Sequence, residues 1–223
     1  MRSGWAKAMA RPWNDTSPDA ALRLERGSAE FLSQCAAQLC SKGANRVLSP
    51  PLDRSMSKVW TDAGFEQALV LDLHRRSLVT PIPQPDHFVE DGSEQDWSEA
   101  ARIDTAAFAT TWRMGALGLE EARQATPNNR FLVTRDGDRL TGFAIVGQAM
   151  STGYLQRIAV DPADHGAGYG RSLVRATCRW ASQRGAVAII LNTQPDNEAA
   201  AGLYRSEGFE VTKGALAVLG RAC

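Results

Sequence analysis

The sequence predicts an α/β fold in which helices cover both faces of a mixed β-sheet. Asp136-Gly137 lies between two alternating apolar segments and predicts an antiparallel hairpin. A strand that ends at Val160 leads through a glycine-rich turn into an amphipathic helix. The near-continuous apolar run 186–191 follows that helix, and such runs are typical of strands covered on both faces.

The composition is that of an ordinary globular protein and argues against several functions. The 223 residues, 43% hydrophobic and 22% charged, are enough to bury a core without a metal or disulfide staple. Lys and Arg number 25, as do Asp and Glu, so no nucleic-acid partner is expected. No apolar run approaches the roughly 18 residues of a membrane span, and the N-terminal segment does not resemble a secretory signal. We therefore expect no membrane partner and a cytoplasmic location.

The cysteines do not predict a metal site. Cys35 and Cys40 have no histidine nearby. Cys178 lies within an apolar helical pattern, which predicts a small buried thiol. We therefore expect no bound metal.

Helix and strand signals alternate before residue 80. The first twenty residues show no period and are expected to form a loose lead-in. Apolar periodicity then predicts a helix over 28–41, an apolar stretch at 47–48, a helix over 53–63 and a strand over 65–79. Three prolines within 81–85 predict a stiff extended connector, which we take as a domain boundary.

The same signals predict the elements after the connector. These are a strand over 87–90, helices over 94–114 and 119–124, strands over 130–134 and 139–149, and a strand over 153–160.

The helix that follows the glycine-rich turn has the clearest pattern. Its apolar positions recur at helical spacing and form one stripe: Tyr169, Leu173, Ala176 and Trp180. Its basic positions are expected on the exposed face: Arg171, Arg175 and Arg179. Gly185 occupies the position of a left-handed C-terminal cap.

The turn itself contains Gly166, Gly168 and Gly170. Glycines let main-chain amides approach an oxyanion, and a helix start adds unpaired N–H groups, so a pyrophosphate is the natural ligand. A tight loop that merely needs positive φ is the alternative. A Walker A loop is disfavoured because no Gly-Lys-Ser/Thr follows, and the glycine spacing is a poor match to a dinucleotide fingerprint.

Two blocks of sequence resemble the GCN5-related N-acetyltransferase (GNAT) superfamily. The first is the run from His165 to Gly170, preceded by the apolar-Val-Asp-Pro lead of Ala159 to Pro162. The second has the spacing Asn-x-x-Ala-x-x-Leu-Tyr-x-x-x-Gly-Phe and extends from Asn197 to Phe209. The resemblance covers about residues 86–223 and implies a GNAT fold, whose mixed sheet is strongly twisted.

The resemblance implies acetyl-CoA as cosubstrate and assigns residues to it. The main chain around Ile158 and Val160 would pair with the pantetheine arm, the amides of the glycine turn would hold the pyrophosphate, and Asn197 would contact the arm. The full implied set is Ile158, Ala159, Val160, His165, Gly166, Ala167, Gly168, Tyr169, Gly170, Arg171 and Asn197.

Tyr204 takes the position of the family's general acid. A thiol with a pKa of about 8.5 leaves as a thiolate, and a phenol with a pKa of about 10 can protonate it. A core tyrosine on an amphipathic helix is the alternative. The resemblance further implies direct attack by the amine, with the amide of Val160 as a candidate donor to the thioester oxygen.

Two positions depart from the family pattern. His165 replaces the usual Gln or Arg at the entrance of the turn, which is expected to weaken one phosphate contact. Asn192 stands where some members that acetylate proteins carry a glutamate, and an amide cannot accept a proton at neutral pH. The base would then be Glu120, Glu121 or a water chain, although both glutamates also fit a solvated helix surface. Alternatively, the acceptor is an amine of low pKa that needs little help.

The N-terminal part contains a weaker copy of the second block. Gly64-Phe65-Glu66 recurs 144 positions later, and at this offset Trp60 corresponds to Tyr204. No triple-glycine turn precedes the first helix. The predicted organisation is therefore a degenerate GNAT-like half-domain over 1–80 with a structural or substrate-wall role, the connector 81–85 and a catalytic domain over 86–223. A half-unit exposes sheet edges, so it is expected to pack on the catalytic domain or on a second copy in a homodimer.

These observations favour transfer of an acetyl group to a primary amine of a small molecule or a protein N-terminus. The alternatives are a non-catalytic acyl-CoA-binding module that docks a partner and, less favoured, a nucleotide-binding protein that uses the same glycines. The identity of the acceptor does not follow from the sequence, because fold does not determine function.

Overall fold

The computed structural model describes residues 1–14 and 17–223 and divides the chain into two compact units. The first unit contains Met1–Asp72 and Lys213–Cys223, and the second contains Leu73–Thr212. Two strands, β5 (Glu66–Ser77) and β11 (Glu210–Ala222), have residues in both units.

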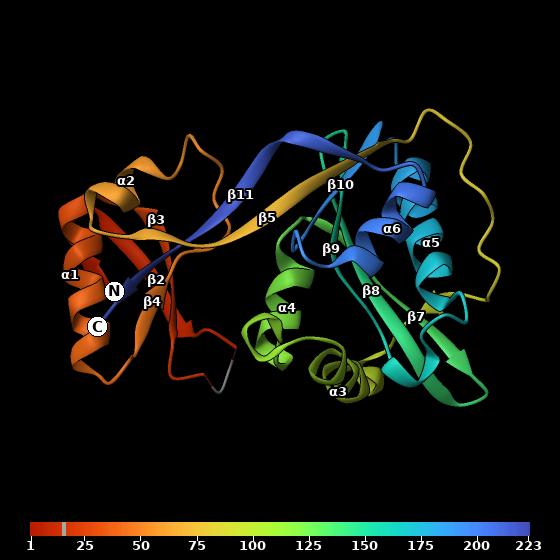
Figure 1. Cartoon of the computed structure of the whole chain (residues 1–223), viewed down its shortest axis with the longest axis horizontal. Helices are drawn as coiled ribbons and strands as arrows, with labels where there is room; N and C mark the ends of the chain where they lie inside the picture. The colour runs from red at the N-terminus through yellow and green to blue at the C-terminus, as the bar shows by residue number, and fades with distance from the viewer. Residues whose placement is uncertain (15–16) are drawn as a thin grey trace. The chain divides into compact units, whose positions relative to one another are not determined.

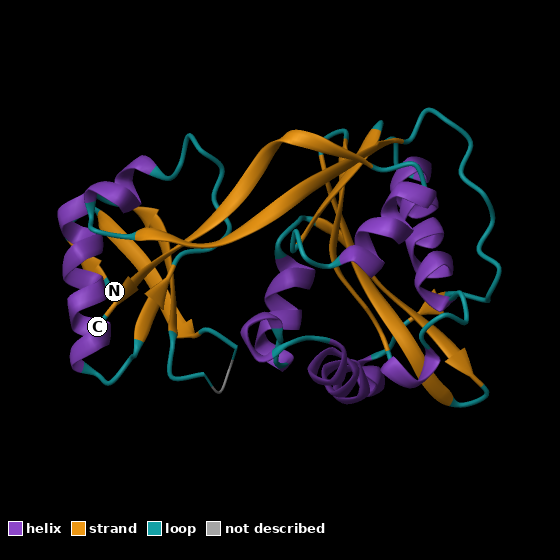
Figure 2. Ribbon diagram, in the orientation of Figure 1, coloured by secondary structure: helices purple, strands orange, loops and turns teal. Residues whose placement is uncertain are grey.

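A mixed sheet forms the centre of the second unit (Figure 2). Its strands follow the order β5-β10-β9-β8-β7-β6. The bounds are β6 (Glu90–Asp91), β7 (Asn128–Asp136), β8 (Arg139–Ala149), β9 (Thr152–Val160) and β10 (Ala188–Thr193). β6 to β9 are antiparallel, whereas β9 and β10 are parallel. This confirms the predicted mixed α/β fold.

Helices cover both faces of this sheet (Figure 1). α3 (Trp97–Ala107) and α4 (Ala116–Gln124) lie on one face, and α5 (Tyr169–Gln183) and α6 (Glu198–Ser206) lie on the other. Short 3-10 turns occur at Glu94–Asp96, Thr110–Trp112 and Pro162–Asp164. Neighbouring strand residues point to opposite faces, so Leu132 packs on the α5 side and Phe131 on the α3 side.

The helix predicted over 94–114 is broken. It ends at Ala107, because Phe108 is extended, and the chain then runs through a separate 3-10 turn. The Asp104 carboxylate accepts a hydrogen bond from the Met114 amide at 2.6 Å and thereby holds the returning segment against the helix. Local periodicity does not reveal this break, because the bond joins residues ten positions apart.

The first unit has its own small core. Its elements are β1 (Arg2–Ser3), β2 (Ala6–Pro12), β3 (Ala20–Arg26), α1 (Ala29–Ser41), β4 (Arg46–Leu48) and α2 (Lys58–Asp62). The predicted loose lead-in is wrong, because β2 and β3 form an antiparallel pair whose residues Ala8 and Leu22 are buried under α1. Positions 15–16, within the predicted lead-in, lie outside the described residues.

The four cysteines have two different environments. Cys40 at the end of α1 and Cys223 after β11 form a disulfide within the first unit. Cys35 and Cys178 are free and buried, as predicted for Cys178. Burial raises the pKa of Cys178 to about 12, so this thiol stays protonated and is unsuited to a covalent relay.

Two classes of feature are absent from the described residues. None of the helices formed by 1–14 and 17–223 has the length and apolar character that crossing a bilayer requires. In the same ranges, no group of three or more His, Cys, Asp or Glu residues is placed to hold a metal ion.

Candidate acetyl-CoA site

β9 and β10 diverge after a short paired stretch. Their registered pairs run from Thr152–Ala188 to Tyr154–Ile190 and end there. On its other edge, β9 remains paired with β8 as far as Val160. Alternate residues between 155 and 160 therefore direct their N–H and C=O groups toward an open edge.

A bulge in β9 lies where the two strands diverge. Val146 pairs with Leu155 and Ile145 pairs with Arg157, so Gln156 has no partner in the register with β8. A bulge of this kind bends a strand and increases its local twist. The bend accounts for an edge that turns away from β10.

The glycine turn lies directly after this open edge. Asp161 starts it by accepting a hydrogen bond from the Ala163 amide at 3.0 Å, and Arg102 lowers the pKa of this carboxyl. Gly166 and Gly168 have φ values of 83° and 93°, which favour glycine. Gly168 is also the N-cap of α5.

The main-chain donors of this turn are largely unused. Within the described part of the chain, the His165, Ala167 and Ser172 amides donate to backbone carbonyls. No acceptor in that part is bonded to the remaining amides, which are those of Gly166, Gly168, Tyr169, Gly170 and Arg171. A row of free N–H groups at a helix N-terminus is suited to a diphosphate.

The turn, β9 and α6 come together at Gly170. A Cβ built on this glycine would lie 3.4 Å from Leu203 of α6 and 3.5 Å from Val160 of β9. Leu203 precedes Tyr204, so the second sequence block lies beside the first. The structure thus brings the predicted site residues together in one unit.

The strand residues of the predicted site alternate between the two faces. Ile158 and Val160 pack on the α5 side of the sheet, and Ala159 is buried on the α3 side. His165 is exposed, and its Nε2 lies 3.1 Å from the Val160 carbonyl oxygen, to which it donates. This bond ties the entrance of the turn to the end of the strand.

Asn197 caps helix α6. Its Oδ1 accepts a hydrogen bond from the Ala200 amide at 3.2 Å, as expected of an N-cap asparagine. Its Nδ2 has one long contact of 3.5 Å to Gln194. The capping role is therefore visible, and a contact between Asn197 and the pantetheine arm stays a prediction.

Tyr204 is a buried member of the core on the α5 side. Its side chain is only 5% exposed, and its ring centroid lies 5.8 Å from the rings of both His74 and Phe209. Burial raises the pKa of Tyr204 to about 12, whereas the positive charge of Arg157 acts in the opposite direction. The phenol therefore keeps its proton at neutral pH. Its catalytic role stays a prediction.

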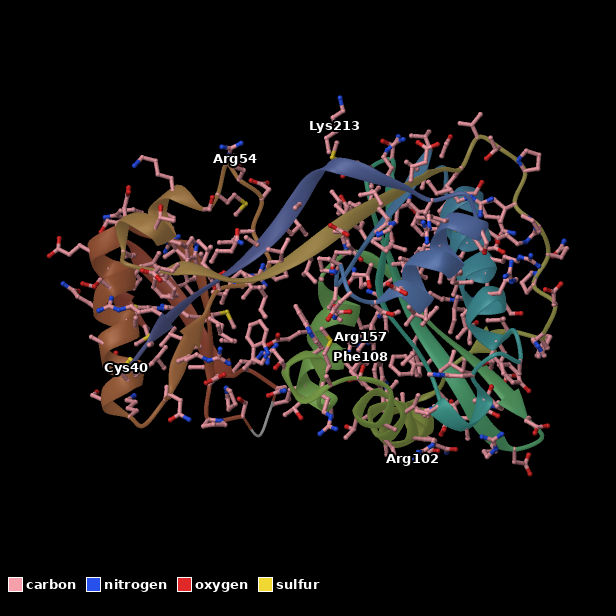
Figure 3. The ribbon with its side chains drawn as sticks, viewed as in Figure 1. Cys40, Arg54, Arg102, Phe108, Arg157 and Lys213 are labelled. Carbon is pink, nitrogen blue, oxygen red and sulfur yellow. A yellow bond between two sulfur atoms is a disulfide. The ribbon has the colours of Figure 1, made fainter. Side chains whose placement is uncertain are left out.

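A buried ion pair on the other side of β9 was not predicted from the sequence. Arg157 donates two hydrogen bonds to Asp104, at 2.6 and 2.9 Å, and a third to the Trp112 carbonyl at 2.7 Å. Its guanidinium also stacks 3.6 Å from the Phe108 ring centroid (Figure 3). The pair fixes α3 and the segment after it to the strand that carries the open edge. No local pattern links residues so far apart in sequence.

Both candidate bases lie on α4, where Glu120 is half-buried and Glu121 is exposed. Glu120 is held by Arg123 at 2.6 Å and by Gln124, and Arg123 lowers the pKa of this carboxyl. A carboxylate with a lowered pKa is a weak proton acceptor. Asn192 is exposed on β10.

We expect Glu120→Gln to leave kcat and its pH profile unchanged, because the carboxylate is engaged on the surface of α4. Steady-state rates between pH 6 and 9 test this. A loss of the acidic limb of the profile in this variant would identify Glu120 as the base.

Known proteins that are similar to this chain include acetyltransferases. A family model described as "Acetyltransferase (GNAT) family" matches residues 97–209. The N-alpha-acetyltransferase RimI of Mycobacterium tuberculosis is 39% identical over 90 residues, which are 39% of this chain and 55% of the relative. A mycothiol acetyltransferase of Nocardia farcinica is 30% identical over 191 residues, which are 77% of this chain and 63% of the relative.

The solved structures agree on the fold. A GCN5-related N-acetyltransferase from Sphaerobacter thermophilus superimposes with a TM-score of 0.63 and 16% identity, covering 97% of this chain and 76% of that chain. At this identity the likeness concerns the fold alone. The chain spans only part of the length of the two curated relatives, 55% of the first and 63% of the second.

Proposed function

Because this chain belongs to the acetyltransferase (GNAT) family, we propose that it transfers the acetyl group of acetyl-CoA directly to a primary amine. The observation that carries the proposal is the set of unused amides of Gly166 and of residues 168–171, placed directly after the open edge of β9. Acetyl-CoA is the cosubstrate that the family implies. Its diphosphate suits the unused amides of the turn, and its amide-containing arm suits the open edge of β9.

The residues of the turn and the strand would bind and orient the cosubstrate. The free amides of the turn would hold the diphosphate, and the open edge between Leu155 and Val160 would pair with the arm. The bulge at Gln156 supports this arrangement because it bends β9 away from β10. The Val160 amide is our candidate donor to the thioester oxygen.

Tyr204 would supply the proton. When acetyl-CoA is bound, its thioester offers a carbonyl carbon to the amine, and the carbon–sulfur bond breaks as the carbon–nitrogen bond forms. The protonated phenol of Tyr204 would donate to the departing sulfur, the proton lost by the amine would pass to solvent, and the phenolate would regain a proton from solvent. With its pKa raised to about 12 the phenol is protonated at neutral pH, as a general acid must be, although the same shift makes it a weaker acid.

The acceptor is proposed by class. The two curated relatives are named for an N-alpha-acetyltransferase and for mycothiol acetylation, so we propose the amine of a small molecule or a protein N-terminus. The engaged carboxylate of Glu120 and the amide at Asn192 support an amine of low pKa, because such an amine is partly neutral without a strong base.

We further propose that residues 1–80 are a degenerate copy of the latter half of the GNAT unit in residues 86–223. The order helix, strand, helix, strand is the same in α1-β4-α2-β5 and α5-β10-α6-β11. Gly64 and Gly208, 144 positions apart, have φ values of 81° and 80°. β3 is parallel to β4, as β9 is to β10. Trp60, at the position of Tyr204, is buried against Phe65, and its indole N–H is not acidic enough to protonate a thiolate.

The two compact units do not follow the boundaries of this sequence repeat. Residues 81–85 lie inside the second unit, and the end of β11 belongs to the first.

The cytoplasmic location and the homodimer remain proposals. A reducing cytoplasm would keep Cys40 and Cys223 as thiols, so their oxidation state in the cell tests the location.

The proposed activity is tested by mixing the protein with acetyl-CoA and a panel of amines and following the release of free thiol. We expect release that depends on the amine, at a rate that saturates with acetyl-CoA. Tight binding of acetyl-CoA without turnover on any amine would instead support a binding module. Equal affinity for ADP and CoA would point to a nucleotide-binding protein.

A further inference from the structure

The proline-rich connector is bound along helix α5. Arg175 donates to the Gln84 carbonyl at 3.1 Å and to the Asp86 carboxylate at 2.8 Å, and Arg179 donates to the Ile82 carbonyl at 3.1 Å. The predicted exposed face of α5 is therefore wrong for Arg175, whose side chain is only 14% exposed. We call residues 81–87 the strap (Figure 1).

The strap ends on the glycine turn at His87. The His87 imidazole Nε2 lies 2.8 Å from the Ala167 carbonyl oxygen, and the His87 amide donates to the buried Ser172 hydroxyl at 3.0 Å. The imidazole also stacks on the Tyr169 ring, with centroids 4.2 Å apart and planes 30° apart. A Cβ added at Gly168 would lie 3.3 Å from Nε2. The His87 side chain thus bonds to Ala167, stacks on Tyr169 and lies beside Gly168 between them.

The bond to Ala167 fixes the direction of a main-chain donor. A carbonyl can only accept, so Nε2 carries the proton in this bond. The Ala167 carbonyl and the Gly168 N–H belong to one planar trans peptide and point in opposite directions. Holding the carbonyl toward His87 therefore directs the Gly168 N–H away from His87, and the bond also polarises the peptide.

The turn needs such support because its sequence is flexible. Glycine populates positive and negative φ with similar ease, so an unsupported peptide between Ala167 and Gly168 can rotate. Ordering it on binding would reduce the affinity for the ligand. Within the described residues, His87 is the part of the strap that reaches this peptide.

We propose that His87 is a positioning residue for diphosphate binding, which holds the Ala167–Gly168 peptide so that the Gly168 N–H faces the ligand. This inference rests on the proposed function, since it assigns the diphosphate of acetyl-CoA to the turn. His87 acts through the backbone of the turn, and the ligand contact belongs to Gly168.

The test compares two cosubstrates and three variants. His87→Ala removes the bond, whereas His87→Gln offers an amide N–H of similar reach. Phe88→Ala is the matched control, because this neighbouring aromatic side chain is 81% exposed. The cosubstrates are acetyl-CoA and S-acetyl-pantetheine, which has the thioester arm but no diphosphate.

We expect His87→Ala to raise KM for acetyl-CoA and Kd for CoA by about three- to tenfold, with kcat unchanged, because one oriented hydrogen bond is lost. The same variant should use S-acetyl-pantetheine with unchanged kcat/KM. His87→Gln should recover most of the affinity, and Phe88→Ala should behave as the wild type. Thermal unfolding of each variant checks that the fold is retained.

Three outcomes would overturn the inference: unchanged affinity for CoA in His87→Ala, an equal loss with S-acetyl-pantetheine, or no recovery in His87→Gln. If His87→Ala does not fold, the affinities of His87→Gln and His87→Asn for CoA are compared instead. Only the longer glutamine amide reaches the Ala167 carbonyl, so His87→Asn should bind CoA more weakly. A wild-type protein that binds neither CoA nor acetyl-CoA would overturn the proposed function together with the inference. Normal binding by the wild type and by His87→Ala would overturn the inference alone.

Discussion

Replacing Tyr204 with phenylalanine is expected to lower kcat by about a hundred- to a thousandfold, the usual contribution of a positioned general acid. Affinity for CoA should not change, because the substitution removes one oxygen from a side chain that is otherwise packed in the core. The measurement is the rate of thiol release at saturating acetyl-CoA, together with a CoA titration.

The control is Tyr154→Phe, because Tyr154 lies in the paired part of β9 and is not assigned to the chemistry. This variant should keep the wild-type rate. If Tyr204→Phe also keeps that rate, Tyr204 is a core residue and another group protonates the sulfur.

The pH dependence of kcat follows from the same burial. An ordinary phenol has a pKa of about 10, but the pKa of Tyr204 is raised to about 12. The protonated form is the active one, so raising the pH through 10 should not reduce kcat through this group. A decline that begins only on approaching pH 12 is expected, and one centred near pH 10 would show that the phenol is exposed when acetyl-CoA is bound.

Breaking the Asp104–Arg157 pair is expected to have the largest effect on stability. Asp104 is 0% exposed and the Arg157 side chain 10%, and Asp104 also accepts the Met114 amide. Asp104→Asn would leave the buried guanidinium without its counter-charge and should reduce the free energy of unfolding by about 3–5 kcal/mol. Urea denaturation followed by tryptophan fluorescence measures the change.

Glu99→Gln serves as the control from the same helix. Its ion pair with Arg102 is exposed, with side chains 39% and 49% accessible, so a loss of at most about 1 kcal/mol is expected. Equal losses in the two variants would contradict the account, because the buried pair would then contribute no more than a surface pair.

The elements that sequence predicts best are those determined by local spacing. Leu173, Ala176 and Trp180 of the predicted stripe pack in the core and Gly185 has a positive φ, because helical periodicity and positive φ are properties of neighbouring residues. Tyr169, the first residue of the predicted stripe, instead stacks on His87. The apolar run near Ile189 was confirmed as β10 for the same reason.

The features that sequence did not predict depend on contacts between distant positions. β2 and β3 contain few strand signals, and their pairing is stabilised by packing under α1. Arg175 was expected on the exposed face of α5, but it binds the strap at Gln84, which lies 91 positions earlier in the sequence. The Asp104–Arg157 pair spans 53 positions. A single sequence has no periodic signal for such contacts.

The site falls between these cases. The glycine turn could be found because the φ values of Gly166 and Gly168 require glycine, and the two blocks have a recognisable spacing. His87 could not be found in this way, because it reaches the turn from a segment 80 positions earlier.

A crystal structure of the protein with bound CoA tests the central claim most directly. We expect the diphosphate oxygens to lie about 3 Å from amide nitrogens of the Gly166–Arg171 turn, at hydrogen-bonding distance. The sulfur should lie within about 4 Å of the Tyr204 hydroxyl, at the range of a hydrogen bond to sulfur. A diphosphate bound elsewhere, or a Tyr204 hydroxyl enclosed by the core and remote from the sulfur, would contradict the account.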